Sequence, residues 1–259
     1  MRCLMLTVAY RGTDFCGWQI QDGQPSIQQC LEQAFEKITG EQVRITGSGR
    51  TDSGVHALGQ VASLQTGSEM DCERLVRGLN ATTPGDISVL DVRDMPLDFH
   101  AIQSAKRKMY RYQMQHGRVR NPIERDFCWF VPARLDVEAM QEACRKIEGE
   151  HDFLCFQAAG AATRSSIRKI FHCGLTEIHG SGFDKLVFEI EGNGFLYNMV
   201  RNIVGSLVVI GKNKRPASWI NELIASRDRS LAGETAPPQG LFLVKVDYGL
   251  RGATGNSPP

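Results

Sequence analysis

The stretch that decides the fold spans residues 26–40 and reads SIQQCLEQAFEKITG. It predicts an amphipathic helix, because Ser26 and Gln29 form a capping box at its start and Gly40 ends it. Its apolar side chains recur at helical spacing: Ile27, Cys30, Leu31, Ala34, Phe35 and Ile38. A helix with one apolar face must bury that face, so we expect it to pack on a sheet.

Strands and helices alternate around this helix in two rounds. The first round predicts strands at 2–9, 60–65 and 87–92, a short segment at 43–46 and a helix at 71–79. The second round predicts strands at 109–114, 127–131, 167–177, 185–190 and 241–247, and helices at 136–147, 195–211 and 217–225. This order predicts an α+β fold of two halves, each a largely antiparallel sheet backed by helices.

The boundary between the halves is predicted near residues 96–104. It gives an N-terminal half of residues 1–104 and a C-terminal half of residues 105–248. Residues 249–259 are small, polar and rich in proline at the end, which predicts a disordered tail.

Composition excludes several classes of protein. Of the 259 residues, 42% are hydrophobic and 23% charged, which is typical of a water-soluble globular protein. The formal charge of +1 provides no global field toward nucleic acid or membrane, so a polyanionic partner must meet a local patch. No apolar run is long enough for a membrane span or patterned as a signal peptide, so we expect a cytoplasmic protein. The eight cysteines form no CxxC pair and are expected to be reduced and mostly buried.

The glycine-rich segment 47–57, GSGRTDSGVHA, is the first candidate for chemistry. Its glycines can bring backbone, Arg50 and the short carboxylate of Asp52 close to a ligand. One alternative is a surface turn in which Asp52 bonds neighbouring amides. Another is the D-[S/T]-G triplet of aspartic proteases, but that chemistry needs two such aspartates and the chain has a single copy.

A second candidate is the basic and aromatic segment 106–112, KRKMYRY, which several arginines follow. Tyr110 and Tyr112 would share one strand face, while Arg111 would face the other side. Basic side chains bind phosphates and aromatic rings stack on bases, so the segment predicts RNA recognition with Lys106, Lys108 and Arg111 among the substrate-binding residues. The alternative is a solvated edge strand with core tyrosines.

Arg201 stands inside the predicted apolar helix at 195–211. Such an arginine either extends to the surface or is held against a buried carboxylate. The histidines show no metal-binding spacing, and the chain has neither a P-loop nor a Rossmann glycine pattern. We therefore expect no metal and no nucleotide cofactor.

Five motifs in order give the chain a resemblance to a known family. They are YRGTDFCGWQ at 10–19, GRTDSGVHA at 49–57, KMYRY at 108–112, GFL at 194–196 continuing to MVRNIVG at 199–205, and APPQGL at 236–241. Together they resemble the bacterial tRNA pseudouridine synthase A family, over roughly residues 3–248.

The resemblance implies a role for each matching residue. Asp52 would be the catalytic nucleophile, Arg201 its ion-pair partner, Tyr110 the ring that stacks on the target uracil, and Arg50 the cation that helps displace the base. Leu241 would also contact the substrate. Isomerising uridine breaks N1–C1′ and forms C5–C1′ within one nucleotide, so the reaction needs no cofactor.

The resemblance also implies a wider arrangement. It predicts two ferredoxin-like (RRM-like) halves with the active cleft between them, and uridines 38 to 40 of the tRNA anticodon stem-loop as targets. It further predicts a homodimer that holds tRNA across two protomers, with no membrane partner. The sequence departs from the family pattern at Ser53, where alanine is usual, and at Asn198, where histidine is common. A non-catalytic RNA-binding protein of the same fold is the alternative function.

Overall fold

The computed structural model describes residues 1–158, 160, 164–180 and 183–250. Most of the predicted disordered tail, residues 251–259, lies outside this range. The first half of the chain forms β1 (Arg2–Tyr10), α1 (Ile27–Thr39), β2 (Thr46–Gly47), β3 (His56–Thr66), α2 (Cys72–Thr82) and β4 (Ile87–Met95). Its strands lie in the order β4-β1-β3-β2, all antiparallel. This βαββαβ arrangement is ferredoxin-like.

The second half repeats the arrangement with longer strands. Its sheet is built from β5 (Arg107–His116), β8 (Ile167–His179), β9 (Asp184–Gly192) and β10 (Leu241–Asp247), in the antiparallel order β10-β5-β9-β8. The helices are α3 (Val137–Arg145), α4 (Met199–Gly211) and α5 (Trp219–Ser226). Two short strands, β6 (Trp129–Val131) and β7 (Gly149–Asp152), pair with β5 and β8, and single 3₁₀ turns lie at Leu154–Phe156, Arg229–Leu231 and Pro238–Gly240. The predicted α+β fold of two ferredoxin-like halves is confirmed.

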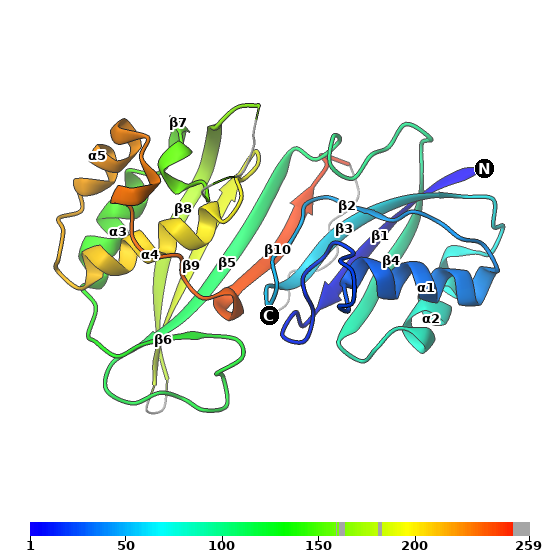
Figure 1. The fold of residues 1–259 in the computed structure, drawn as a ribbon, viewed down its shortest axis with the longest axis horizontal. Helices are drawn as coiled ribbons and strands as arrows, with labels where there is room; N and C mark the ends of the chain where they lie inside the picture. Colours follow the sequence, from blue (N-terminus) through cyan, green and yellow to red (C-terminus); the bar gives the residue numbers. More distant parts are fainter. Residues whose placement is uncertain (159, 161–163, 181–182, 251–259) are drawn as a thin grey trace.

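The two sheets are joined into one ten-stranded sheet by the last strand of the chain. β10, orange-red in Figure 1, lies between β3 and β5. It is antiparallel to β5 and pairs in parallel with β3 through Phe242 opposite His56 and Leu243 opposite Ala57. Because β2 occupies only two residues of that edge of β3, the remainder of the edge is open to β10. The loop that carries Asp52 connects β2 to β3 and therefore lies where the halves meet.

Helices cover each half of the sheet separately, α1 and α2 at one end and α3, α4 and α5 at the other (Figure 1). The predicted caps of α1 are present: the Ser26 hydroxyl accepts the Gln29 N–H at 3.2 Å, and Gly40 has a φ of 76°. Leu31 and Phe35 of this helix are fully buried in the main core, and each such burial stabilises the fold by about 1.5–3 kcal/mol.

The structure corrects several predicted boundaries. The helix predicted at 195–211 begins only at Met199, because Asn198 has a left-handed φ of 59° and the residues before it line a cavity instead. β3 starts at His56 rather than at residue 60, because β10 supplies its first pairing partners. The strand at β7 was not predicted. The alternative of an edge strand for segment 106–112 is wrong, since β5 lies between β10 and β9.

Two predictions from composition have structural outcomes. All eight cysteines are free and five of them are buried, as expected: Cys3, Cys128, Cys144, Cys155 and Cys173. Across the part of the chain that the structure describes, the helices are too short or too polar to cross a membrane.

Gly205 in the middle of α4 provides a test of the packing around the Arg201 helix. A Cβ built on Gly205 would lie 1.7 Å from the backbone oxygen of Glu234. We expect Gly205→Ala to lower the free energy of unfolding by about 3 kcal/mol, because backbone packs on backbone here and neither can yield cheaply. Urea denaturation measures this. Gly85→Ala is the control, since nothing lies within 4 Å of the Cβ it would add, and equal losses in the two variants would contradict the packing argument.

Candidate active site

The Asp52 loop is held in place by the segment that follows β1. Gly17 and Asp52 form an isolated antiparallel bridge, and the Trp18 N–H donates to the Thr51 carbonyl at 3.0 Å. Gly17 is required here, because its φ is 111° and a Cβ would lie 2.4 Å from the Thr51 oxygen. Within the loop, the Val55 N–H donates to the Asp52 carbonyl at 3.1 Å. The first two sequence motifs therefore form one structural unit.

A chain of buried hydrogen bonds supports the loop from beneath. The Tyr10 hydroxyl and the Thr51 hydroxyl lie 2.8 Å apart. Gln60, which is fully buried, donates to the Gly49 carbonyl at 2.8 Å and accepts from the Ser48 hydroxyl at 2.7 Å. Buried polar groups that are fully paired make a segment rigid. The backbone on the N-terminal side of Asp52 is thus fixed by side chains from β1 and β3.

His56 belongs to the same motif, and both of its ring nitrogens hydrogen-bond to backbone groups. Its Nδ1 accepts the Gly12 N–H at 3.0 Å, so its Nε2–H donates to the Asp126 carbonyl at 2.9 Å. Burial lowers the pKa of His56, which keeps the ring neutral. His56 therefore ties the loop after β1 to the segment before β6.

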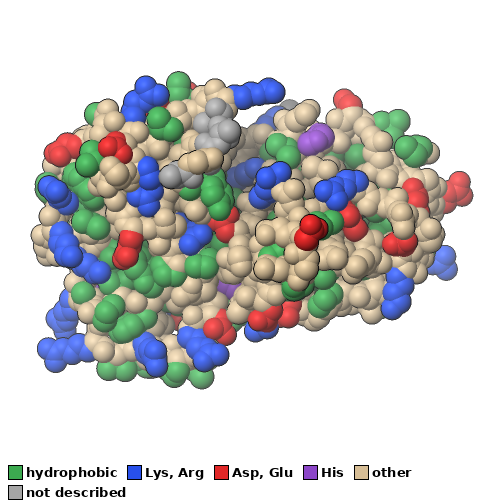
Figure 2. Space-filling view, in the orientation of Figure 1, with side chains coloured by type: hydrophobic (Ala, Val, Ile, Leu, Met, Phe, Trp, Pro, Cys, Tyr) green, Lys and Arg blue, Asp and Glu red, His purple; other side chains and the backbone are tan. Residues whose placement is uncertain are grey.

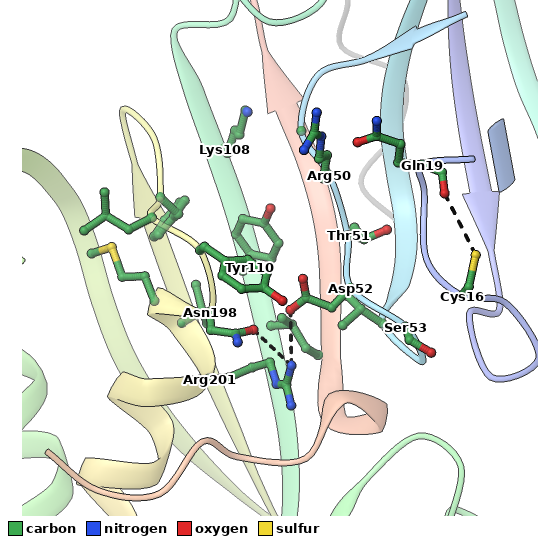
Figure 3. Close-up of a pocket in the computed structure, with 18 of the residues that line it drawn as sticks. Cys16, Gln19, Arg50, Thr51, Asp52, Ser53, Lys108, Tyr110, Asn198 and Arg201 are labelled. Carbon is green, nitrogen blue, oxygen red and sulfur yellow. Dashed lines mark hydrogen bonds and ion pairs between the residues drawn. The ribbon is translucent and has the colours of Figure 1, made fainter. Parts of the chain in front are cut away.

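Arg201 of α4 reaches Asp52 across the junction of the two halves (Figure 3). Its Nη1 lies 3.1 Å from Asp52 Oδ2, and the two side chains are 14% and 22% exposed. The same Nη1 donates to Asn198 Oδ1 at 3.0 Å, and Nε donates to the Ala236 carbonyl at 2.7 Å. Of the two alternatives for Arg201, the structure shows pairing with a carboxylate and excludes extension to the surface.

The charge state of Asp52 is set by two opposing effects. Burial raises the pKa of Asp52 above its ordinary value, and the Arg201 guanidinium opposes this rise through its charge and its hydrogen bond. Asp52 is the only carboxylate among the described residues that line the cavity. An aspartic-protease site would need two carboxylates sharing one proton, so the structure gives that alternative no support.

Tyr110 and Lys108 project from β5 toward the same cavity, as strand alternation predicts (Figure 3). Tyr110 is buried and packs edge-on against Phe195, with ring centroids 5.1 Å apart. Burial raises its pKa, so the phenol stays neutral. The Lys108 ammonium donates to the Ser48 carbonyl at 2.6 Å, and burial together with the charge of Arg168 lowers its pKa to about 8.

The cavity at the junction has a volume of about 830 Å³ and is lined by residues from both halves. It brings together six predicted site residues: Arg50, Asp52, Lys108, Tyr110, Arg201 and Leu241. In Figure 2, Lys and Arg side chains lie in and beside the hollow between the halves. Arg50 is exposed there, while Leu241 is buried as the first residue of β10.

Two predicted substrate-binding residues lie elsewhere. Lys106 is exposed outside the cavity, next to Gly249. Arg111 faces the opposite side of β5 and pairs with Glu189 of β9 at 2.8 Å. Strand alternation places Arg111 on the face opposite Tyr110, whereas Lys106 lies just before β5, and neither cation lines the cavity that holds Asp52.

Sequence reasoning missed other residues at the site. The apolar pattern places Phe195 in a helix, yet this residue precedes α4 and packs against Tyr110. Asn198 departs from the family pattern, and the sequence does not show that its side chain contacts Arg201. Its backbone conformation could have been suspected, because asparagine is among the few residues enriched at left-handed φ.

A possible metal-binding group lies away from the cavity. Glu177, His179 and Asp184 place their ligand atoms within 4.8 Å of one another at the exposed end of β8 and β9. The pairing of His179 with Asp184 across the two strands creates this group, which linear spacing did not predict.

Comparisons with known proteins identify the family of the chain. The profile of the tRNA pseudouridine synthase family matches residues 6–102 and 143–249. A "tRNA pseudouridine synthase A" from Thermoanaerobacter sp. (strain X514) is 42% identical over 96% of this chain and all of its own length. One from Myxococcus xanthus is 43% identical over 95% of this chain and 91% of its own. Among solved structures, a Cbf5-Nop10-Gar1 complex aligns with a TM-score of 0.34 at 13% identity, covering 79% of this chain and 53% of that one.

The matching family model and the curated relatives assign the protein to the isomerases. The chain belongs to the tRNA pseudouridine synthase family.

Proposed function

We propose that this protein isomerises uridine to pseudouridine at positions 38 to 40 of the tRNA anticodon stem-loop, with Asp52 as the nucleophile. The observation that carries the proposal is the contact of 3.1 Å between Asp52 and Arg201 inside the cavity. The cavity volume of about 830 Å³ falls within the range of about 300–1,000 Å³ typical of small-ligand sites. One flipped nucleotide is a ligand of that class.

The geometry of Asp52 suits a reaction within one nucleotide. The Arg201 guanidinium opposes the rise that burial causes in the pKa of Asp52, which favours the ionised carboxylate. Of the two carboxylate oxygens of Asp52, only Oδ2 has a hydrogen-bond partner among the described residues. Oδ1 is therefore left for the substrate. The reaction breaks N1–C1′ and makes C5–C1′, so uracil leaves and rejoins the same sugar and no atom is gained or lost.

The base must leave its stem before Asp52 can reach it, which costs a few kcal/mol. Tyr110 provides an aromatic surface in the cavity on which the extruded uracil stacks. Arg50 lies exposed on the Asp52 loop, where a cation can take the place of the displaced base and contact phosphate. Lys108 and Leu241 complete the wall of the nucleotide site.

The proposal extends to the cellular arrangement. The substrate is the anticodon arm of tRNA, the enzyme acts in the cytoplasm, and two copies form a homodimer that holds one tRNA across both protomers. Lys106 and Arg111 lie outside the cavity and would contact the RNA backbone away from the reacting nucleotide.

Tyr110 variants test the stacking role. We expect Tyr110→Ala to lower turnover by about tenfold or more, because base–aromatic stacking is worth about 1–3 kcal/mol. Tyr110→Phe keeps the ring and should retain most of the turnover. Rates of pseudouridine formation on tRNA transcript measure both, and equal rates for the two variants would contradict stacking.

The function itself is tested by mapping pseudouridine in an unmodified tRNA transcript incubated with purified protein and EDTA. Because the chemistry requires no metal, we expect product to form in the presence of EDTA, and the proposed specificity confines it to positions 38 to 40. Product at other positions would refute the anticodon-arm specificity. Bound tRNA with no product would leave a non-catalytic RNA-binding protein.

A further inference from the structure

The asparagine that precedes α4 is used in an unusual way. Asparagine at the N-cap of a helix normally accepts a backbone N–H from the first turn. The Asn198 side chain makes no such bond, and its backbone adopts a left-handed φ of 59°. Its Oδ1 instead accepts from Arg201 Nη1 at 3.0 Å. The side chain is therefore turned away from the helix end and toward the guanidinium (Figure 3).

This contact controls how Arg201 meets Asp52. Arginine and a carboxylate commonly pair through two parallel hydrogen bonds, which occupy both oxygens. Here the Ala236 carbonyl accepts the Nε–H and Asn198 accepts one Nη1 hydrogen, which leaves a single Nη1 hydrogen for Asp52. Among the described residues, the Nη2 group makes no hydrogen bond to that carboxylate. The pair is thus held through Oδ2 only, and Asp52 Oδ1 has no partner among the described residues.

We infer that Asn198 is a positioning residue, which orients Arg201 so that it holds one oxygen of Asp52 and leaves the other free to react. Without the Asn198 acceptor, the guanidinium can turn to a two-point pair that covers both oxygens. The inference rests on the proposed function, because it assumes that Asp52 Oδ1 meets the nucleotide. Asn198 acts through Arg201 and not on the substrate, so its removal slows the reaction without weakening tRNA binding.

The test compares glycine and histidine at this position. Asn198→Gly removes the acceptor but accepts the left-handed backbone without strain, and we expect kcat to fall on the order of tenfold with KM and the tRNA Kd unchanged. Asn198→His restores a ring nitrogen acceptor in a residue tolerated at left-handed φ, and should recover most of kcat. Asn213→Gly is the matched control, because Asn213 is exposed past the other end of α4 with a φ of 56°. It should leave kcat unchanged.

Each contrary result is distinct. Wild-type kcat in Asn198→Gly, or a raised KM at unchanged kcat, would overturn the positioning role. Asn198→His as slow as Asn198→Gly, with both variants unfolding at the wild-type midpoint, would also overturn it. If the wild-type protein forms no pseudouridine, the proposed function fails first and the inference fails with it.

Discussion

Replacing Asp52 by alanine is expected to abolish pseudouridine formation while leaving tRNA affinity unchanged. Asp52 is the sole carboxylate among the described residues of the cavity, so no neighbouring carboxylate can replace it as the proposed nucleophile. Loss of a nucleophile typically lowers turnover by about 10⁴ to 10⁶-fold. Affinity for tRNA depends on contacts to many phosphates, to which a single buried carboxylate adds nothing.

Two measurements check this prediction: single-turnover formation of pseudouridine and a binding titration with the same transcript. Asp98→Ala is the control, since Asp98 is an exposed aspartate outside the cavity. Turnover by Asp52→Ala within about tenfold of wild type would remove Asp52 from the role of nucleophile. A large loss of tRNA affinity would instead assign Asp52 a binding role.

Replacing Arg201 by methionine is expected to lower both activity and stability. Methionine keeps most of the apolar stem but leaves Asp52 without its cation. We expect the free energy of unfolding to fall by about 2 kcal/mol at neutral pH. Breaking a fully buried ion pair costs about 3–5 kcal/mol, and the loss is smaller here because both side chains keep some solvent contact. Turnover should fall at least 10²-fold, on the scale of losing one preorganised electrostatic partner.

The pH dependence of this variant separates the ion pair from simple packing. The pKa of Asp52 is raised in the folded state, so the folded protein holds this proton more tightly than the unfolded chain. Protonation of Asp52 therefore stabilises the fold at low pH, and this contribution is lost as the pH rises through the folded pKa. Without Arg201 the pKa rises further, so this loss is larger. Denaturant unfolding of Arg201→Met should therefore approach wild type as the pH is lowered and Asp52 becomes protonated.

A double variant provides the control for the Arg201 prediction. Asp52→Asn together with Arg201→Met should be more stable than Arg201→Met alone at neutral pH, because no unpaired charge remains. A stability loss in Arg201→Met that is independent of pH would assign the effect to packing rather than to charge.

Local patterns in the sequence predicted the elements that depend on near neighbours. α1 follows from its caps and apolar spacing, and the opposite faces of Tyr110 and Arg111 follow from strand alternation. The residues alone left the role of Arg201 open, and only the family resemblance implied the ion pair, because its partner is 149 residues away in the chain. An apolar helix that contains one arginine has the same sequence pattern whether or not a carboxylate from a distant segment lies beside the arginine.

The remaining differences also have non-local causes. The start of β3 depends on pairing with β10, and the sequence of residues 56–60 alone does not predict that pairing. The late start of α4 depends on Asn198, whose side chain is held by Arg201 rather than by the helix end. In both places a contact with a distant segment or with a side chain of the cavity determines where the element begins, rather than the propensity of the local sequence.

The central position of β10 affects when the protein becomes active during its synthesis. N-terminal segments leave the ribosome first and fold as units. Asp52 can thus be in place on its own sheet, yet the strand that joins this sheet to β5 ends at residue 247. A nascent chain that lacks this strand carries the Asp52 loop and the Arg201 helix on two halves whose sheets are not yet joined. We therefore expect catalytic competence only once β10 has been synthesised, because a nascent polypeptide that lacks this strand does not join the two sheets.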